Sequence, residues 1–461
     1  MLLELVNVTT LLELSLLGWV GYCLATAVYN VYFHPLRRFP GPLAARASNG
    51  WKLYMEVFRQ ESPVHLLQKL HQQYGDVVRL RPNELHFSSA NAYNDIYNPS
   101  ARWDKDRVQY ESVGADHSLV SLIPYEEAKQ RKAVLKAWCG EKADRLIEVL
   151  KKRNEEGKSS DLLMAFRCMA LDAATDFCFG TSLEALDAPE FRAPLLVAMD
   201  AALPGFVVMK HFPLLRKIAL SLPSWFVGGL YPDMVGLPRT QEMLRQQVAN
   251  VITHPEVLKA QPHPTVYQRL LQDPEAQHMH AHTASHETVP FDEANTLMFE
   301  ATHTVADPSM FGLFHILSNP TLHARLLAEI RTVWPDSAEG AGPTGPPSLE
   351  VLETLPLLTA TIKESLRMAP GIASPLCRIT PAGGRRHCRP WRAGWRHRWW
   401  LLERKEQREG LEQWFVAFSR GPRSCPGSNL AWCEMYILLS TMLRTFDLRL
   451  RPHHSKRPGV A

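Results

Sequence analysis

The chain has 461 residues, of which 46% are hydrophobic and 21% are charged, an ordinary composition for a globular protein. This length allows one large domain or two or three small ones. The 51 basic and 47 acidic residues give a net charge of only +4, so charge gives no support to a nucleic-acid partner. The eight cysteines include no C-x-x-C pair, and the sequence therefore favours neither a zinc cage nor a dense disulfide framework.

Residues 1–33 are predicted to form a membrane anchor. The stretch from Leu11 to Val28 contains one charged residue, and with the residues up to Phe33 it gives enough helix to cross a hydrocarbon core of roughly 30 Å. No basic region precedes it and no small-residue cleavage site follows, so we expect a retained anchor and not a cleaved signal peptide. Arg37 and Arg38 follow the span, which places the rest of the chain in the cytosol. An amphipathic helix buried in a core is the alternative, although the stretch shows no polar face.

Residues 34–44 contain three prolines, which exclude helix and predict a stiff hinge behind the anchor. Residues 45–461 are then expected to form one domain in which helices dominate up to about residue 370. Residues 77–89 predict two short strands around a Pro-Asn-Glu turn. Further segments are predicted to be helical, namely 126–150, 161–180, 291–320 and 348–370.

Two of these helices carry unusual features. Pro308 lies inside the 291–320 helix, where its ring would clash with the carbonyl group of Thr304 and leave that group without its usual amide partner. We therefore expect the helix to distort at Thr304. In the 348–370 helix, Glu364 and Arg367 lie three residues apart and can pair on one face. Such pairs are common on helix surfaces, so this spacing alone indicates no function.

Cys425 lies in a run of glycine, arginine and proline that excludes helix and strand. The thiolate is the metal-binding form of cysteine, and it must be stabilised where it lies. Gly421 and Gly427 allow a tight turn that points amide groups at the sulfur, Arg423 adds positive charge, and the helix predicted behind the run points its positive end at the same place. No second cysteine or histidine stands at ligand spacing. A metal at Cys425 would be held mainly by another group, and a macrocycle fits that description.

The run fits the pattern F-x-x-G-x-R-x-C-x-G, with its fixed positions at Phe418, Gly421, Arg423, Cys425 and Gly427. This pattern resembles the haem-binding signature of the cytochrome P-450 superfamily. Residues 364–367 resemble the family's E-x-x-R, and residues 300–304 resemble its oxygen-activating A-G-x-D/E-T motif. Short segments such as FHPLRRFPGP are similar to those of the fungal family members that act in secondary metabolism, the group that contains trichodiene oxygenase.

The resemblance implies a mainly α fold with small β-sheets, in the α+β class, behind an N-terminal transmembrane helix. It makes residues 45–461 a haem-thiolate catalytic domain that binds haem b, iron protoporphyrin IX. Cys425 would be the axial iron ligand within the cofactor-binding run. The arginines expected at the propionates are Arg131, Arg378 and Arg423, and Glu364 with Arg367 would form the family's structural pair.

Thr304 and His303 are the expected catalytic residues. Thr304 matches the family's threonine, whereas His303 stands where the family has an acid, and Glu300 with Ala301 replaces its alanine and glycine. Histidine can relay protons near neutral pH, so this departure is tolerable. The resemblance places pocket walls loosely around residues 113–121, 206–212, 299–305 and 372–376.

The implied function is insertion of one oxygen atom of O₂ into a hydrophobic, terpenoid-like secondary metabolite. Electrons would come from an NADPH-dependent cytochrome reductase, because the chain has no G-x-G-x-x-G motif of its own. We expect a single-pass protein of the endoplasmic reticulum membrane that contacts lipid and binds no nucleic acid. Two alternatives are a reductase-independent haem-thiolate isomerase or dehydratase, and an inactive membrane-bound remnant.

Residues 383–400 break the resemblance. They contain six arginines and four tryptophans with a period of neither 2 nor 3.6 residues, and only Arg398 and Trp399 suggest a remnant of the family's meander. We hypothesise that this segment is mis-translated, through a frame shift or a missed intron, which would put the activity of this product in doubt. The alternative is a basic, tryptophan-rich strip that stacks on single-stranded nucleic acid or contacts a lipid surface.

Overall fold

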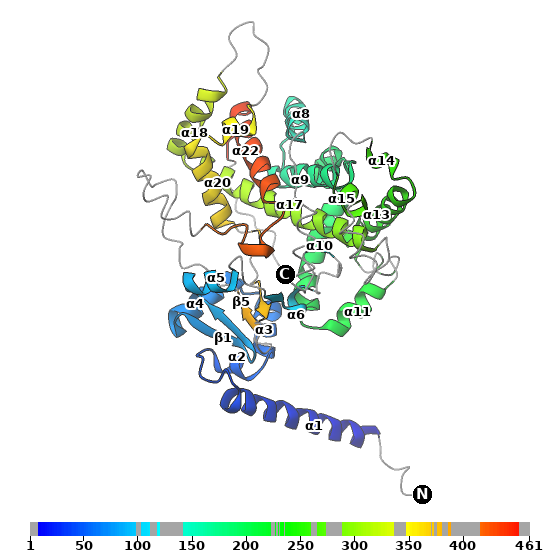
Figure 1. The fold of residues 1–461 in the computed structure, drawn as a ribbon, viewed down its shortest axis with the longest axis vertical. Coiled ribbons are helices and arrows are strands. Elements are labelled where there is room, and N and C mark those ends of the chain that lie inside the picture. Colours follow the sequence, from blue (N-terminus) through cyan, green and yellow to red (C-terminus); the bar gives the residue numbers. More distant parts are fainter. Residues whose placement is uncertain are drawn as a thin grey trace.

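The structure is a computed structural model of the chain. It describes residues 8–97, 103–110, 118–119, 142–222, 226, 229, 231–234, 236–259, 265–272, 288–335, 347–369, 371–372, 376–379, 386–388 and 415–450. Most of these residues are helical, and a small sheet lies near the N-terminal helix (Figure 1). The architecture agrees with the mainly α class with a small sheet that the sequence predicts.

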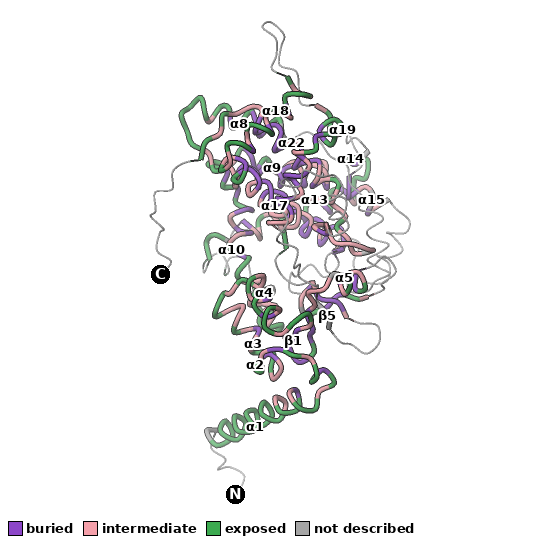
Figure 2. The backbone as a smooth tube through the Cα atoms, turned by 90° about the vertical axis from the view of Figure 1, so that its left-hand side faces the viewer, coloured by how far each residue is buried: buried purple, intermediate pink, exposed green. Residues whose placement is uncertain are grey.

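The N-terminal helix α1, Val8–Val28, continues into a π-helical turn, η1, Tyr29–Phe33. Its side chains are exposed along its length, and it projects from the rest of the chain (Figure 2). The segment Thr10–Phe33 is long and apolar enough to cross a membrane, and no residue of its most apolar 18-residue stretch is buried. The segment Pro189–Met209 passes the same test of length and hydropathy but is 39% buried, as a core helix would be.

Among the described residues the sheet has five strands, in the order β1-β2-β5-β4-β3. The strands β1, Val77–Arg81, and β2, Glu84–Phe87, form an antiparallel hairpin, which confirms the two strands predicted in residues 77–89. The short strands β3, Asp104–Lys105, and β4, Arg378–Ile379, pair antiparallel at the other edge.

The middle strand β5, Arg386–Cys388, falls inside the 383–400 segment, which has no strand periodicity. It pairs parallel with β2 and antiparallel with β4. The sequence shows no strand period here, so this strand could not be predicted from its side-chain pattern. Backbone pairing with two neighbours defines the strand, and side-chain periodicity carries no information about such pairing.

The long helix α17, Thr288–Leu317, lies at the centre of the helical part (Figure 1). It packs against α9, Leu162–Phe179, α20, Pro356–Met368, and α22, Ser428–Thr445. The other longer helices in the described part of the chain are α4, Pro63–Tyr74, α5, Ala90–Tyr97, α8, Lys142–Glu155, α10, Pro194–Met209, α11, Pro213–Ser221, α13, Gly236–Thr253, and α18, Pro320–Val333. The short ones there are α2, Leu43–Ala47, α3, Gly50–Leu53, η2, Tyr54–Phe58, α6, Arg107–Tyr110, η4, Ala185–Asp187, η5, Pro189–Phe191, η6, Pro232–Met234, α14, Glu256–Lys259, α15, Val266–Gln272, α19, Leu349–Leu352, and η8, Gly421–Arg423.

Local chemistry explains the boundaries of α9 and the start of α20. The Asp161 carboxylate accepts the first amide hydrogens of α9, and Gly180 ends this helix in the left-handed conformation, so the helix predicted at 161–180 is confirmed. The helix predicted at 348–370 is instead two helices, because Pro356 has a fixed φ, lacks an amide hydrogen and begins α20 as a new helix. The expected distortion at Thr304 does not interrupt α17, which runs continuously through Pro308.

Glu434, on α22, is buried in the core with 7% of its surface exposed. In the described part of the chain neither oxygen of its carboxyl group has a hydrogen-bond partner, and burial raises its pKa from 4.5 to about 8. The folded protein therefore keeps this proton up to about pH 8, whereas the unfolded chain loses it near pH 4.5. The contribution of Glu434 to stability is complete below pH 4.5 and is lost as the pH rises to 8.

We expect Glu434→Gln to stabilise the protein by about 3 kcal/mol at pH 7, because the amide has nearly the same shape and never ionises. Urea unfolding of wild type and variant from pH 4 to pH 8 measures this difference. The difference in stability between the two proteins should decrease towards zero near pH 4. A difference that does not depend on pH would contradict the effect of burial on Glu434.

Candidate functional site

The loop that carries Cys425 is closed by backbone hydrogen bonds. The Cys425 amide donates to the Phe418 carbonyl oxygen over 2.9 Å, and the Ser424 amide donates to the Gly421 carbonyl oxygen over 3.0 Å. Gly421 has a φ of +70°, a conformation that favours glycine. The Cys425 side chain is exposed, and α22 begins three residues later, so the positive end of this helix lies close to the thiol.

Two residues of the pattern shape the surroundings of this thiol. A Cβ atom on Gly427 would lie 4.0 Å from the Cys425 sulfur, so the glycine keeps the space beside the sulfur open. The Phe418 ring packs on the Trp432 ring with 5.8 Å between centroids, which fixes the start of the loop to α22. The loop therefore presents an exposed sulfur from a backbone that is held in place.

Three cationic side chains meet beside this loop. Arg378 and Lys105 are buried, with 3% and 7% exposed, and Arg423 is half-buried. Burial, and then the positive charges of Arg423 and Arg378, hold the pKa of Lys105 well below its usual range. A partner with two negative charges would relieve this repulsion among the three basic side chains.

Aromatic groups hold Arg378 in place. Its Nη1 donates to the Tyr110 hydroxyl over 2.8 Å, and its guanidinium lies 5.1 Å from the centroid of the Tyr97 ring. The Lys105 ammonium donates to the Leu119 carbonyl oxygen over 3.2 Å. Sequence reasoning found Arg378 but missed Lys105, which stands in a polar stretch with no distinguishing pattern.

The helix α17 reaches the same place through Glu300 and Thr304. The Thr304 hydroxyl donates to the carbonyl oxygen of Glu300. Burial raises the pKa of the Glu300 carboxyl group, and the opposing effect comes from Lys105. Lys105 thus interacts with Glu300 on α17 and with Arg423 of the cysteine loop. The two parts of the expected site therefore converge on one side chain.

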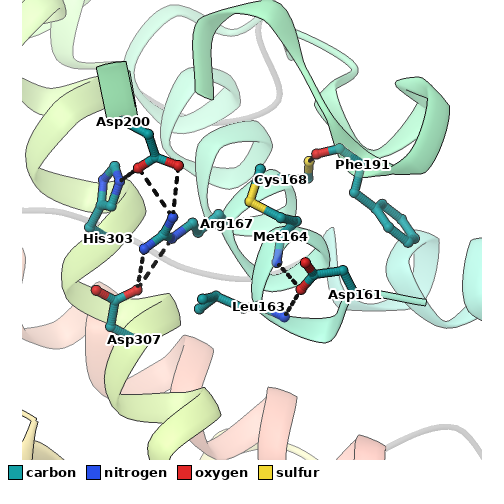
Figure 3. A network of polar contacts seen from close by, with 9 residues as sticks. All are labelled: Asp161, Leu163, Met164, Arg167, Cys168, Phe191, Asp200, His303 and Asp307. Atoms are coloured by element: carbon teal, nitrogen blue, oxygen red, sulfur yellow. Dashed lines mark hydrogen bonds and ion pairs between the residues drawn. The ribbon is translucent and has the colours of Figure 1, made fainter. Parts of the chain in front are cut away.

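His303 points to a different set of partners (Figure 3). Its Nε2 lies 3.1 Å from Oδ1 of Asp200, on α10. Arg167, on α9, donates to both carboxylate oxygens of Asp200 and also contacts Asp307, one turn beyond His303 on α17. Sequence reasoning named only His303 of this group.

Glu364 and Arg367 form a bidentate ion pair on α20, with nitrogen to oxygen distances of 2.6 and 2.8 Å. Their side chains are 12% and 6% exposed, so this pair belongs to the interior and not to the helix surface. Arg131 and Arg398, the other arginines singled out from the sequence, lie outside the described residues.

Residues 46–382 and 397–459 match the family model for Cytochrome P450. The chain belongs to the cytochrome P450 family. It is 33% identical to the cytochrome P450 monooxygenase flvC of Aspergillus flavus, over 95% of this chain and 90% of the relative. It is 30% identical to macH of Penicillium terrestre, over 92% and 89%, and 30% identical to the tryptophan 6-hydroxylase fscE of Fusarium equiseti, over 96% and 92%.

As a cytochrome P450 the chain is an oxidoreductase of a monooxygenase family whose cofactor is a haem held by a thiolate. The residues present fit such a group, because an exposed thiol at a helix N-terminus lies beside cations that suit two propionates. The family match skips residues 383–396, an interval inside the 383–400 segment that departs from the resemblance.

Gly371 holds the segment after α20 close to Thr304. A Cβ atom there would lie 2.7 Å from Cγ2 and 2.8 Å from Cβ of Thr304, closer than real contacts allow. We expect Gly371→Ala to lower the free energy of unfolding by about 1–3 kcal/mol and to weaken haem retention, because Thr304 or the Gly371 segment must shift.

Denaturant unfolding and the haem content of the purified protein measure the effect of this change. Gly205→Ala is the matched control, because a Cβ atom there would meet only Met209 Cε, at 3.8 Å. Equal stability of the two variants would show that the close approach to Thr304 has no energetic consequence.

Proposed function

We propose that this cytochrome P450 inserts one oxygen atom of O₂ into a hydrophobic, terpenoid-like secondary metabolite, with haem b bound through Cys425. The supporting observation is the cysteine loop, which offers an exposed thiol beside Lys105, Arg378 and Arg423. A haem with a thiolate ligand activates O₂ for attack on unactivated C–H bonds.

The chain's own residues have distinct roles in this proposal. The positive end of α22 and Arg423 favour the anionic form of the Cys425 sulfur. Arg423, Arg378, the newly found Lys105 and Arg131 would hold the propionates. Thr304 Oγ1 would hold a proton and pass it on towards the reacting oxygen, and His303, next to it in the chain, would supply that proton.

The apolar surroundings of α17 support a hydrophobic substrate. The Phe206 ring, on α10, meets the Phe299 ring, on α17, edge to face with 6.1 Å between centroids. Both rings lie within segments that the family resemblance assigns to pocket walls. Hydroxylation at carbon is also the reaction that the name of the Fusarium equiseti relative, tryptophan 6-hydroxylase, describes for that protein.

We further propose that an NADPH-dependent cytochrome reductase is the electron donor. We also propose that α1 anchors the chain in the endoplasmic reticulum membrane, with the catalytic domain in the cytosol. The exposed apolar side chains of α1 support the anchor. The helix α11 adds a second apolar surface, on which Leu214 is 72% and Ile218 is 51% exposed.

The function is tested with holoprotein, a reductase, NADPH and ¹⁸O₂ on a panel of terpenoid and indole compounds. We expect a product that carries one ¹⁸O atom and forms only when NADPH and O₂ are both present. Conversion without them would favour the isomerase or dehydratase alternative. Protein that binds no haem would favour the inactive remnant.

We also propose that residues 383–400 are mis-translated, since the family match resumes at residue 397 after it stops at residue 382. Sequencing the transcript across the codons for residues 378–411 tests this hypothesis. A transcript that encodes the printed sequence without interruption would contradict it and leave the basic, tryptophan-rich strip to be explained as a contact surface.

A further inference from the structure

Four charged or titratable side chains from three helices form a cluster around Arg167 (Figure 3). One of them, His303, precedes Thr304 in the chain. We call it the Arg167 cluster; it consists of Arg167 on α9, Asp200 on α10, and His303 and Asp307 on α17. Arg167 is 13% exposed and holds Asp200 and Asp307 on opposite sides of its guanidinium. The cluster therefore joins α10 to the helix that carries Thr304.

The contact between His303 and Asp200 determines which nitrogen of the imidazole ring carries the proton. An ionised carboxylate can only accept a hydrogen bond, so the 3.1 Å contact to Asp200 Oδ1 requires a proton on Nε2 of His303. In the neutral ring Nδ1 is then the acceptor. No hydrogen-bond partner of Nδ1 is found among the described residues. The ring thus has one nitrogen fixed by Asp200 and one nitrogen open to a proton.

Asp200 is held firmly, although it lies near solvent. Its side chain is 41% exposed, and both of its oxygens accept hydrogen bonds from Arg167 Nη1, at 3.1 and 3.2 Å. The Arg167 guanidinium is fixed from its other side by Asp307 Oδ1, at 3.0 and 3.3 Å. His303 itself is 16% exposed, so protons from solvent can reach its ring.

We propose that Asp200 is a positioning residue that holds His303 in the Nε2–H tautomer, so that the ring delivers protons from Nδ1 towards Thr304. This inference rests on the proposed function. His303 takes a proton from water at Nδ1. The Nδ1 proton then passes to the Thr304 hydroxyl, which releases its own proton towards the reacting oxygen. The carboxylate that α17 lacks at position 303 is thus supplied by α10.

The competing explanation is that the Arg167 cluster only holds the three helices together and has no role in proton transfer. The chain offers a matched pair of variants to separate the two, Asp200→Asn and Asp307→Asn. Both aspartates bind Arg167 and they are similarly exposed, at 41% and 45%, but only Asp200 contacts His303. If the cluster only held the helices together, the two substitutions would have the same effect on His303.

The experiment is ¹⁵N NMR of histidine-labelled holoprotein in its reduced carbon monoxide form, with the His303 signals assigned by their loss in His303→Gln. We expect the Nε2–H tautomer in wild type and in Asp307→Asn, a mixture of both tautomers in Asp200→Asn, and recovery of the single tautomer in Asp200→Glu. An unchanged tautomer in Asp200→Asn, an equal change in Asp307→Asn, or an Nδ1–H tautomer in wild type would overturn the proposal.

The Soret band of the same samples reports thiolate ligation independently of His303. A wild-type sample without the thiolate band would refute the proposed function, whereas the tautomer tests Asp200. The Soret band reports on the iron ligand and the NMR signals report on His303. One of the two measurements can therefore contradict its hypothesis while the other supports its own.

Discussion

Replacing Cys425 by serine is expected to abolish the red-shifted Soret band of the reduced, carbon monoxide-treated protein. The shifted band requires a thiolate on the iron, and a serine hydroxyl does not replace the thiolate as an anionic ligand. The serine is close in size and leaves the loop hydrogen bonds of the backbone unchanged, so haem can still enter the site. The measurement is a difference spectrum of purified wild type and variant at equal protein concentration.

The matched control is Cys23→Ser, on α1. Cys23 is also an exposed cysteine, but it lies in the N-terminal helix, far along the chain from the cysteine loop. This variant should keep the shifted band. A band that survives in Cys425→Ser would show that the sulfur of Cys425 is not the ligand.

Replacing Arg367 by leucine is expected to destabilise the protein by about 3–5 kcal/mol, because it leaves the buried Glu364 carboxylate without its bidentate partner. The two side chains are only 6% and 12% exposed, so water cannot replace the lost hydrogen bonds. Urea unfolding of the holoprotein measures the loss, and the haem content of the purified variant should fall with it.

Arg145→Leu provides the comparison. Arg145 pairs with Glu148 and Asp187 on the surface, where these side chains are 47%, 69% and 47% exposed. The loss of such an exposed pair costs about 0–1 kcal/mol. If Arg367→Leu were no more destabilising than Arg145→Leu, the pair on α20 would not support the fold as we describe.

Features determined by neighbouring residues were predicted correctly from the sequence. The hairpin of β1 and β2 follows from a turn between short apolar runs, and the ends of α9 follow from Asp161 and Gly180. The cysteine loop is equally local, since Gly421 adopts the positive φ that the tight turn needs. In each of these cases the physical cause lies within a few residues of its effect.

Features that depend on distant parts of the chain were missed. Lys105 looks like a surface lysine until the fold places it near Arg378 and Arg423, and Asp200 looks like a solvated helix residue until α10 meets α17. The strand β5 shows no periodicity of its own and is defined by its two neighbours. The break before Pro356 could have been predicted, because a proline at the first position of a helix is a recognised start signal.

The central claim is a bond between the Cys425 sulfur and the iron of a bound haem. X-ray absorption at the iron edge of the purified wild-type protein tests that bond directly. We expect one sulfur neighbour of the iron together with the porphyrin nitrogens, and no sulfur neighbour in Cys425→Ser. Wild-type protein that takes up no iron porphyrin, or whose iron has only nitrogen and oxygen neighbours, would contradict the account.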